Sequence, residues 1–123
     1  MSRQTFPTFF DQPGCVMHNF AIDGSAVGAS AGTAGLDGRG KFLCNISKSA
    51  NVVTIDWQVG FGDIPYVFFQ TATGQNNTLV EIVSSTTQQL VFQTVQAADG
   101  STPVNDADLY VHVDGYDTTS FVS

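Results

Sequence analysis

The chain has 123 residues, of which 42% are hydrophobic and only 12% charged, and its formal net charge is −7. This length predicts one domain with a single core that buries roughly two-thirds of its unfolded surface. Only four basic residues oppose eleven acidic ones, which argues against nucleic-acid binding, and no apolar run reaches the roughly 18 residues of a membrane span.

The first 15 residues are predicted to form an extended N-terminal arm, because they show no period and contain two prolines. Phe6, Phe9 and Phe10 on this arm need a surface that buries them. They either fold back on their own domain or dock on a neighbouring chain, and both alternatives stay open. The arm lacks the apolar core and cleavage site of a signal peptide, so we expect synthesis and assembly in a cytoplasm.

Residues 16–22 alternate as a first strand does, and a long loop is predicted to follow over residues 23–40. The loop is rich in glycine and small residues, with Val27 and Leu36 as its only bulky apolar side chains. A loop of this length is expected to be functional, or to be ordered only by a partner. Its glycines do not predict a phosphate loop, because no helix is predicted after them.

The clearest alternation lies at residues 51–59, where Val53, Ile55 and Trp57 alternate with polar residues. A glycine-rich break follows, and a second strand is predicted from Tyr66. We expect these two strands to form a pair that is the nucleus of the domain. Further strands are predicted at residues 41–46, 78–84, 89–95 and 107–114, of which 78–84 and 89–95 form a hairpin.

About seven to eight short strands, rich in β-branched and aromatic residues, predict an all-β fold, an antiparallel β-sandwich of jelly-roll or Ig-like topology. No segment has helical spacing. The predicted parts are the arm at 1–15, the sandwich at 16–115 and a C-terminal tail at 116–123. The predicted core consists of Phe42, Val53, Ile55, Trp57, Val67, Phe69, Val80, Ile82, Leu90, Phe92, Leu109, Val111 and Val113.

No catalytic constellation is found in the sequence, so we do not expect an enzyme or a cofactor. His18 and His112 are the only imidazoles, and His112 falls on the outward side of its strand. Cys15 and Cys44 are too few and too far apart for a disulfide framework or a zinc site. His18 could meet one of these thiols in space, but the spacing does not favour a cysteine–histidine dyad.

Acidic residues bracket the last predicted strand, and a structural calcium near Asp106 and Asp108 is one interpretation, because calcium prefers several oxygen ligands from one or two loops. The spacing fits no EF-hand. Solvated acidic loops are the alternative interpretation, and no metal site is assigned.

Residues 38–115 resemble the small β-sandwich modules of tailed-phage virion proteins. The resemblance rests on three stretches: VVTIDWQVGFGDIPYVFF, LVEIVSSTTQQLVFQTV and DADLYVHVDG. Such modules occur in capsid decoration (cement) proteins and in tail fibres or tail tips. A chain of this length without repeats or a coiled-coil shaft looks more like a decoration protein.

This resemblance implies a protein on the capsid exterior of the virion that binds the major capsid protein, is a homo-trimer and stabilises capsomer contacts. The expected contacts with the capsid or with other subunits are Phe6, Phe9, Phe10 and Phe121. The alternative is a tail-fibre or tail-tip module that binds a host surface glycan or protein. Its aromatic platform would come from Trp57, Tyr66, Tyr110 and Tyr116, although Trp57 lies on the inward side of its strand.

Overall fold

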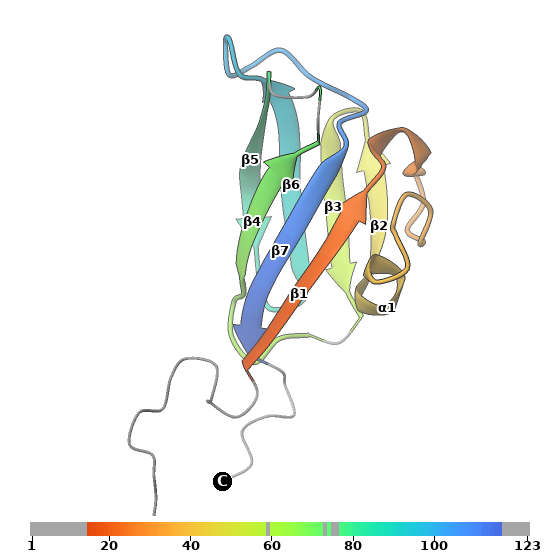
Figure 1. Ribbon diagram of the computed structural model, residues 1–123, viewed down its shortest axis with the longest axis vertical. Coiled ribbons are helices and arrows are strands. Elements are labelled where there is room, and N and C mark those ends of the chain that lie inside the picture. The colour runs from red at the N-terminus through yellow and green to blue at the C-terminus, as the bar shows by residue number, and fades with distance from the viewer. Residues whose placement is uncertain (1–14, 59, 73, 75–76, 117–123) are drawn as a thin grey trace, which may run out of the picture.

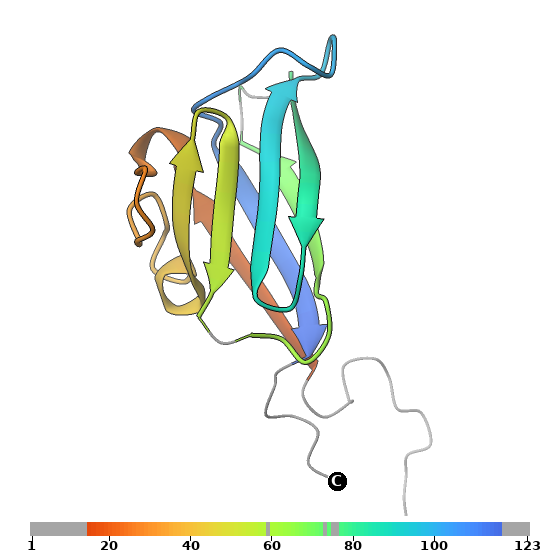
Figure 2. The same ribbon diagram turned by 180° about the vertical axis from the view of Figure 1, so that it is seen from behind.

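The computed structural model describes residues 15–58, 60–72, 74 and 77–116. Within these ranges two antiparallel sheets pack face to face (Figures 1 and 2), so the predicted all-β sandwich is confirmed. No helix in the described ranges has the length and apolar character needed to cross a membrane. The elements are β1 (Cys15–Ile22), η2 (Gly24–Ala26), α1 (Gly40–Leu43), β2 (Cys44–Ser49), β3 (Val52–Trp57), β4 (Tyr66–Thr71), β5 (Thr78–Ser85), β6 (Gln89–Gln96) and β7 (Leu109–Tyr116).

One sheet has the strand order β1-β7-β4 and the other β2-β3-β6-β5. If β2 to β7 are named A to F and β1 is named G, these are the strand orders ABED and CFG of an immunoglobulin sandwich. In this count β1, the first strand of the chain, takes the place of the last strand G. Cys15 is the register partner of Tyr116, so the described domain begins and ends at the same end of the sandwich.

The predicted pairing of the two strands around the glycine-rich break is wrong. β3 pairs with β2 and β6, whereas β4 pairs with β7 in the opposite sheet. The residues between β3 and β4 carry the chain from one sheet to the other, as they do between strands B and C of an immunoglobulin sandwich. The predicted hairpin is confirmed as β5 and β6, with a bulge between Ile82 and Ser84.

The core lies between the two sheets and is formed by every second residue of most strands. Trp57 is buried, and its ring meets Phe61 edge to face with centroids 5.2 Å apart. Three predicted core residues, Val67, Phe69 and Val80, are partly buried and pack against this core. The predicted core residues that are fully confirmed are Val53, Ile55, Trp57, Leu90, Phe92, Leu109, Val111 and Val113.

Two predicted core residues are exposed. Phe42 is 85% exposed because it lies in α1, and the predicted strand at 41–46 begins only at Cys44. Asp37 Oδ1 accepts a hydrogen bond from Gly40 N over 2.8 Å and so stabilises the start of this helical turn. Ile82 is 48% exposed because it lies in β5, the edge strand of the four-stranded sheet, and the opposite sheet has only three strands to cover it. The bulge in β5 directly follows Ile82.

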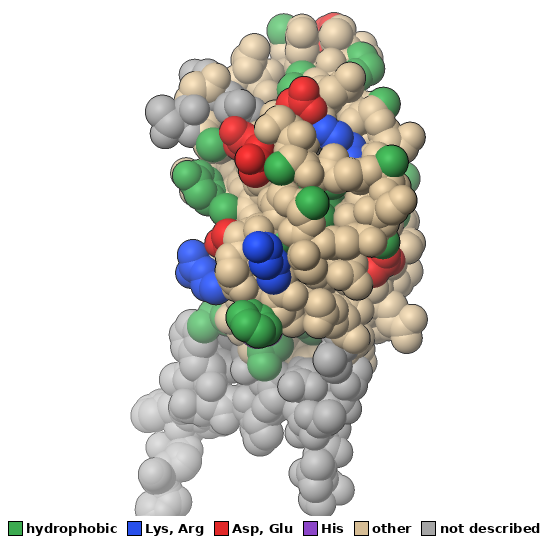
Figure 3. Space-filling model, turned by 90° about the vertical axis from the view of Figure 1, so that its right-hand side faces the viewer, with side chains coloured by type: hydrophobic (Ala, Val, Ile, Leu, Met, Phe, Trp, Pro, Cys, Tyr) green, Lys and Arg blue, Asp and Glu red, His purple; other side chains and the backbone are tan. Residues whose placement is uncertain are grey.

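The segment 23–40 packs on its own sandwich, so the expectation that a partner alone orders it is wrong. Val27 and Leu36 are buried in the core. Leu36 bridges to Ile22, and Gly32 exchanges backbone hydrogen bonds with Ile46. Figure 3 shows the side of the molecule that carries this segment, where basic and acidic side chains lie close together and neither sign forms a continuous patch.

Candidate functional site

The outer face of the three-stranded sheet carries the side chains that alternate with the core residues of β1, β7 and β4. We call it the aromatic face. Its centre is Tyr110, His112 and Asp114 of β7, which point away from the core. The pairing register places three rows across it: Met17–Asp114–Tyr66, Asn19–His112–Phe68 and Ala21–Tyr110–Gln70.

Large apolar side chains lie exposed on the aromatic face. Tyr66 is 69% exposed, Phe68 58%, Tyr110 51% and Met17 47%. Because they come from neighbouring strands of one sheet, they form one patch among polar side chains. An apolar patch with a polar rim is typical of a surface that binds another molecule.

A hollow of about 340 Å³ lies on the aromatic face, and we call it the aromatic groove. Phe68 and Tyr110 line it, and so does Arg39, which directly precedes α1. The side chains that define the aromatic groove are Asn19, Arg39, Phe68, Gln70, Tyr110 and His112.

His112 is held in the aromatic groove by its neighbours. Its Nδ1 lies 2.5 Å from Asn19 Oδ1, and its Nε2 lies 2.8 Å from Asp114 Oδ1. The Asp114 contact is close but is not a hydrogen bond, because Oδ1 has no hydrogen-bond partner of good geometry among the described residues. The Phe68 ring lies 6.0 Å from the imidazole, centroid to centroid. The predicted outward position of His112 is confirmed, and both ring nitrogens face oxygens of the sheet rather than a nucleophile.

Two exposed side chains of the aromatic face, Met17 and Tyr66, lie together with Ile64 at the end of the sandwich where Cys15 pairs with Tyr116, and we call this the terminal end. Met17, Ile64 and Tyr66 are each about half exposed or more there. A smaller hollow of about 180 Å³, lined by Ile64, Tyr66, Asp114 and Tyr116 among others, lies between β4 and the end of β7.

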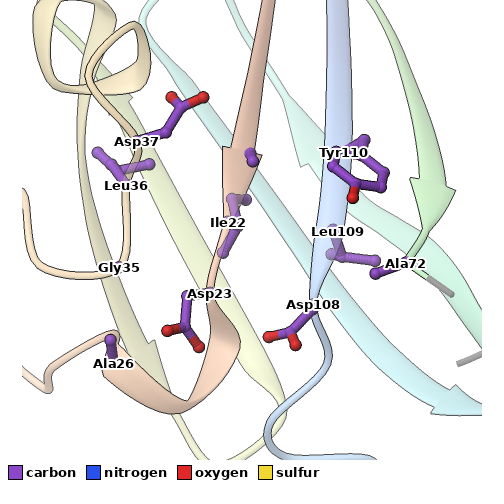
Figure 4. Close-up of a pocket in the computed structure, with 11 residues that line it drawn as sticks. Ile22, Asp23, Ala26, Gly35, Leu36, Asp37, Ala72, Asp108, Leu109 and Tyr110 are labelled. Carbon is purple, nitrogen blue, oxygen red and sulfur yellow. The ribbon is translucent and has the colours of Figure 1, made fainter. Parts of the chain in front are cut away.

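Another hollow, of about 500 Å³, lies beside the segment 23–40 and carries three carboxylates. Figure 4 shows Asp37 at one end of it and Asp23 and Asp108 at the other. Each binds a backbone N–H: Asp108 that of Gly24, Asp23 that of Ser25 and Asp37 that of Gly40. These carboxylates therefore hold the segment in place.

The suggested calcium near Asp106 and Asp108 gains no support. Asp106 is paired with Lys48, and Asp108 accepts from a backbone N–H. Within the described ranges, no group of three or more His, Cys, Asp and Glu residues could hold a metal ion. Cys44 is fully buried, and its pKa is raised to about 12 by burial and then by Asp56 and Asp37. Its thiol is therefore not a nucleophile in this fold.

The structure brings together part of the predicted aromatic platform. Tyr66 and Tyr110 share the aromatic face, whereas Trp57 is buried and Tyr116 is partly buried beside the terminal end. Phe68 was missed as a surface residue, although it has the same parity as Tyr66 in an alternating strand. The predicted contact residues lie outside the described ranges: Phe6, Phe9, Phe10 and Phe121.

No protein-family model, no curated protein and no solved structure matches this chain. The resemblance to phage virion modules therefore stays an expectation from the sequence.

Proposed function

We propose that the protein is a virion structural protein of the decoration class, which attaches to the major capsid protein on the outside of a phage shell through its terminal end. The observation that carries the proposal is that the first and last described residues, Cys15 and Tyr116, are register partners at one end of the sandwich. That end also exposes Met17, Ile64 and Tyr66.

The arrangement fits a protein that grips a larger surface. The predicted contact residues belong to the two terminal segments, Phe6, Phe9 and Phe10 to the first and Phe121 to the second. They join the domain where its own apolar side chains are exposed, so one continuous interface can include all of them. Buried aromatic residues dominate the binding energy of such interfaces, and a stable one buries on the order of 1,600 Å² in total.

The composition also supports attachment to other proteins. Charged residues are 12% of the chain, about half the usual share, and uncharged polar groups cost less to desolvate than charges. A homo-trimer on the capsid exterior is part of the proposal, with no role for nucleic acid, membrane, catalysis or a cofactor.

The test is a shell-binding assay with the double variant Ile64→Ser/Tyr66→Ser. Shells that lack the protein are mixed with wild type or variant, and bound protein is measured after sedimentation. We expect at least tenfold weaker binding, because two central apolar contacts are lost. Ile82→Ser, on the edge of the other sheet, is the matched control and should bind as wild type does. Undiminished binding by the double variant would show that the protein does not attach to the shell through its terminal end.

A second candidate is a tail-fibre or tail-tip module that binds a host surface glycan or protein. The aromatic groove favours it, because exposed Phe68 and Tyr110 lie there among polar side chains. A cryo-EM map of the intact particle separates the two functions: density over the whole shell supports decoration, and density at the tail alone supports the second candidate.

A further inference from the structure

We propose that the aromatic groove is a binding site for a single uncharged sugar ring, such as a neutral hexose or N-acetylhexosamine. This inference rests on the second candidate function and names its site and ligand class. The apolar side chains of the terminal end, which the decoration function uses, are Met17, Ile64 and Tyr66, and none of them lines the aromatic groove, so the two sites can be tested separately.

The two aromatic rings that line the aromatic groove suit the apolar face of a pyranose. Phe68 lies opposite His112 in the register, and Tyr110 lies opposite Gln70. Phe68 and Tyr110 are therefore diagonal neighbours on one face of the β4–β7 pair. Both rings are more than half exposed. The negative face of an aromatic ring attracts positively polarised C–H groups, and one side of a pyranose presents several of these.

The rim of the aromatic groove suits the hydroxyl groups of the same ring. Asn19 and Gln70 each carry an amide that both donates and accepts, and Arg39 offers a fork of donors. His112 is positioned by Asn19, whose Oδ1 lies 2.5 Å from its Nδ1, before any ligand arrives. A rim that is already positioned loses less conformational entropy when it binds.

Charge favours a neutral ligand over an anionic one. Among the described residues, Arg39 is the only Lys or Arg that lines the aromatic groove, and its guanidinium lies 3.8 Å from Asp37 Oδ2. Asp114 lies directly behind His112. With a net charge of −7, the whole molecule also repels anions at long range.

Size and position favour a small ring over a peptide strand. About 340 Å³ is at the small end of the roughly 300–1,000 Å³ range of small-molecule sites. An extended peptide binds by adding to an exposed sheet edge. The centre of the aromatic groove is instead β7, whose backbone is already paired on both sides.

The test uses the full-length protein and NMR titration with methyl glucoside, methyl galactoside, methyl mannoside and N-acetylglucosamine. For one ring on an open surface we expect a Kd on the order of millimolar. At least one sugar should give saturable shifts of Asn19, Gln70 and His112 signals. Phe68→Ala and Tyr110→Ala should each raise Kd by about tenfold or more, with the chemical-shift dispersion of a folded domain retained.

Tyr66→Ala is the matched control, because it removes an exposed aromatic ring from the same face outside the aromatic groove. It should change Kd less than twofold, within the scatter expected for a residue that makes no contact. Glucuronate should bind more weakly than glucose. The absence of saturable shifts with every neutral sugar, an equal loss in Tyr66→Ala, or tighter binding of glucuronate would each overturn the inference. Normal shell binding by Tyr110→Ala would show that such a failure does not extend to the decoration function.

Discussion

Lys48 Nζ donates a hydrogen bond to Asp106 Oδ1 over 2.7 Å and thereby ties β2 to the segment that leads into β7. The same ammonium donates to the carbonyl oxygens of Gly24 and Asn105 over 2.7 and 2.8 Å. Its side chain is only 13% exposed. All three N–H donors are therefore used, and one side chain joins three segments that are distant in the sequence.

Replacing Lys48 by Met should destabilise the fold. The change leaves two carbonyl oxygens and a carboxylate without their donor, and we expect a loss of roughly 2 kcal/mol in the free energy of unfolding. Urea unfolding followed by Trp57 fluorescence measures it. Lys41→Met, at an exposed position of α1, is the control and should unfold at the wild-type midpoint. Equal midpoints for both variants would show that the three contacts do not contribute to stability.

Gly24 cannot carry a side chain where it lies. A Cβ there would be 2.2 Å from the backbone oxygen of Ala107, so either the 3-10 turn or the β7 entry must move. We expect Gly24→Ala to lower the free energy of unfolding by about 2–3 kcal/mol. Gly38→Ala is the matched control, because nothing lies within 4 Å of its Cβ. A denaturant series in which both variants behave alike would contradict the structure at this turn.

Cys44 should be inert to thiol reagents in the native protein. Burial, and then Asp56 and Asp37, raise its pKa from 9.0 to about 12, so the thiolate that reacts is scarce at pH 8. In a Cys15→Ser background, DTNB should react far more slowly with folded than with urea-unfolded protein. Because the folded pKa is raised, the contribution of this thiol to the free energy of unfolding is complete below pH 9. It is lost as the pH rises towards 12. A fast reaction of the folded chain would show that Cys44 is accessible.

The pKa of Asp99 is lowered to about 2, first by the Thr102 hydroxyl and then by the backbone N–H groups of Thr102 and Ser101. Thr102→Val removes the largest of these causes, so the pKa should rise towards 3.8. A carboxyl ¹³C titration by NMR measures it, with Ser101→Ala as a control that keeps both N–H donors. Because the folded pKa is depressed, the stabilising contribution is present above about pH 3.8 and lost as the pH falls to about 2. An unchanged titration in Thr102→Val would assign the shift to the backbone alone.

The sequence predicted the strands well where alternation was strict and poorly where pairing was non-local. Val53, Ile55 and Trp57 are buried as expected, because one face of β3 lies on the core. The pairing partners of β3 could not be predicted from the sequence, because the glycine-rich break after β3 is compatible both with a hairpin and with a connection to the other sheet. Phe42 was misplaced because alternation continues through Cys44, whereas the helical turn before it begins at Gly40, whose N–H donates to Asp37 Oδ1.

The candidate site was predicted only in part. Tyr66 and Tyr110 were named for a platform, and they do share a face, but Trp57 does not join them. The role of Arg39 depends on how the segment 23–40 packs against β1, which no local pattern reveals. Burial of Leu36 fixes that packing and brings Arg39 to the aromatic groove.

The pairing of Cys15 with Tyr116 also determines how the domain responds to force. If the two ends of the chain are pulled apart, the load falls on the first rung of the β1–β7 ladder. Its hydrogen bonds then break one after another instead of sharing the load. The domain is mechanically weak as a link in a tensioned chain, and it withstands load best when both tails are fastened to the same support.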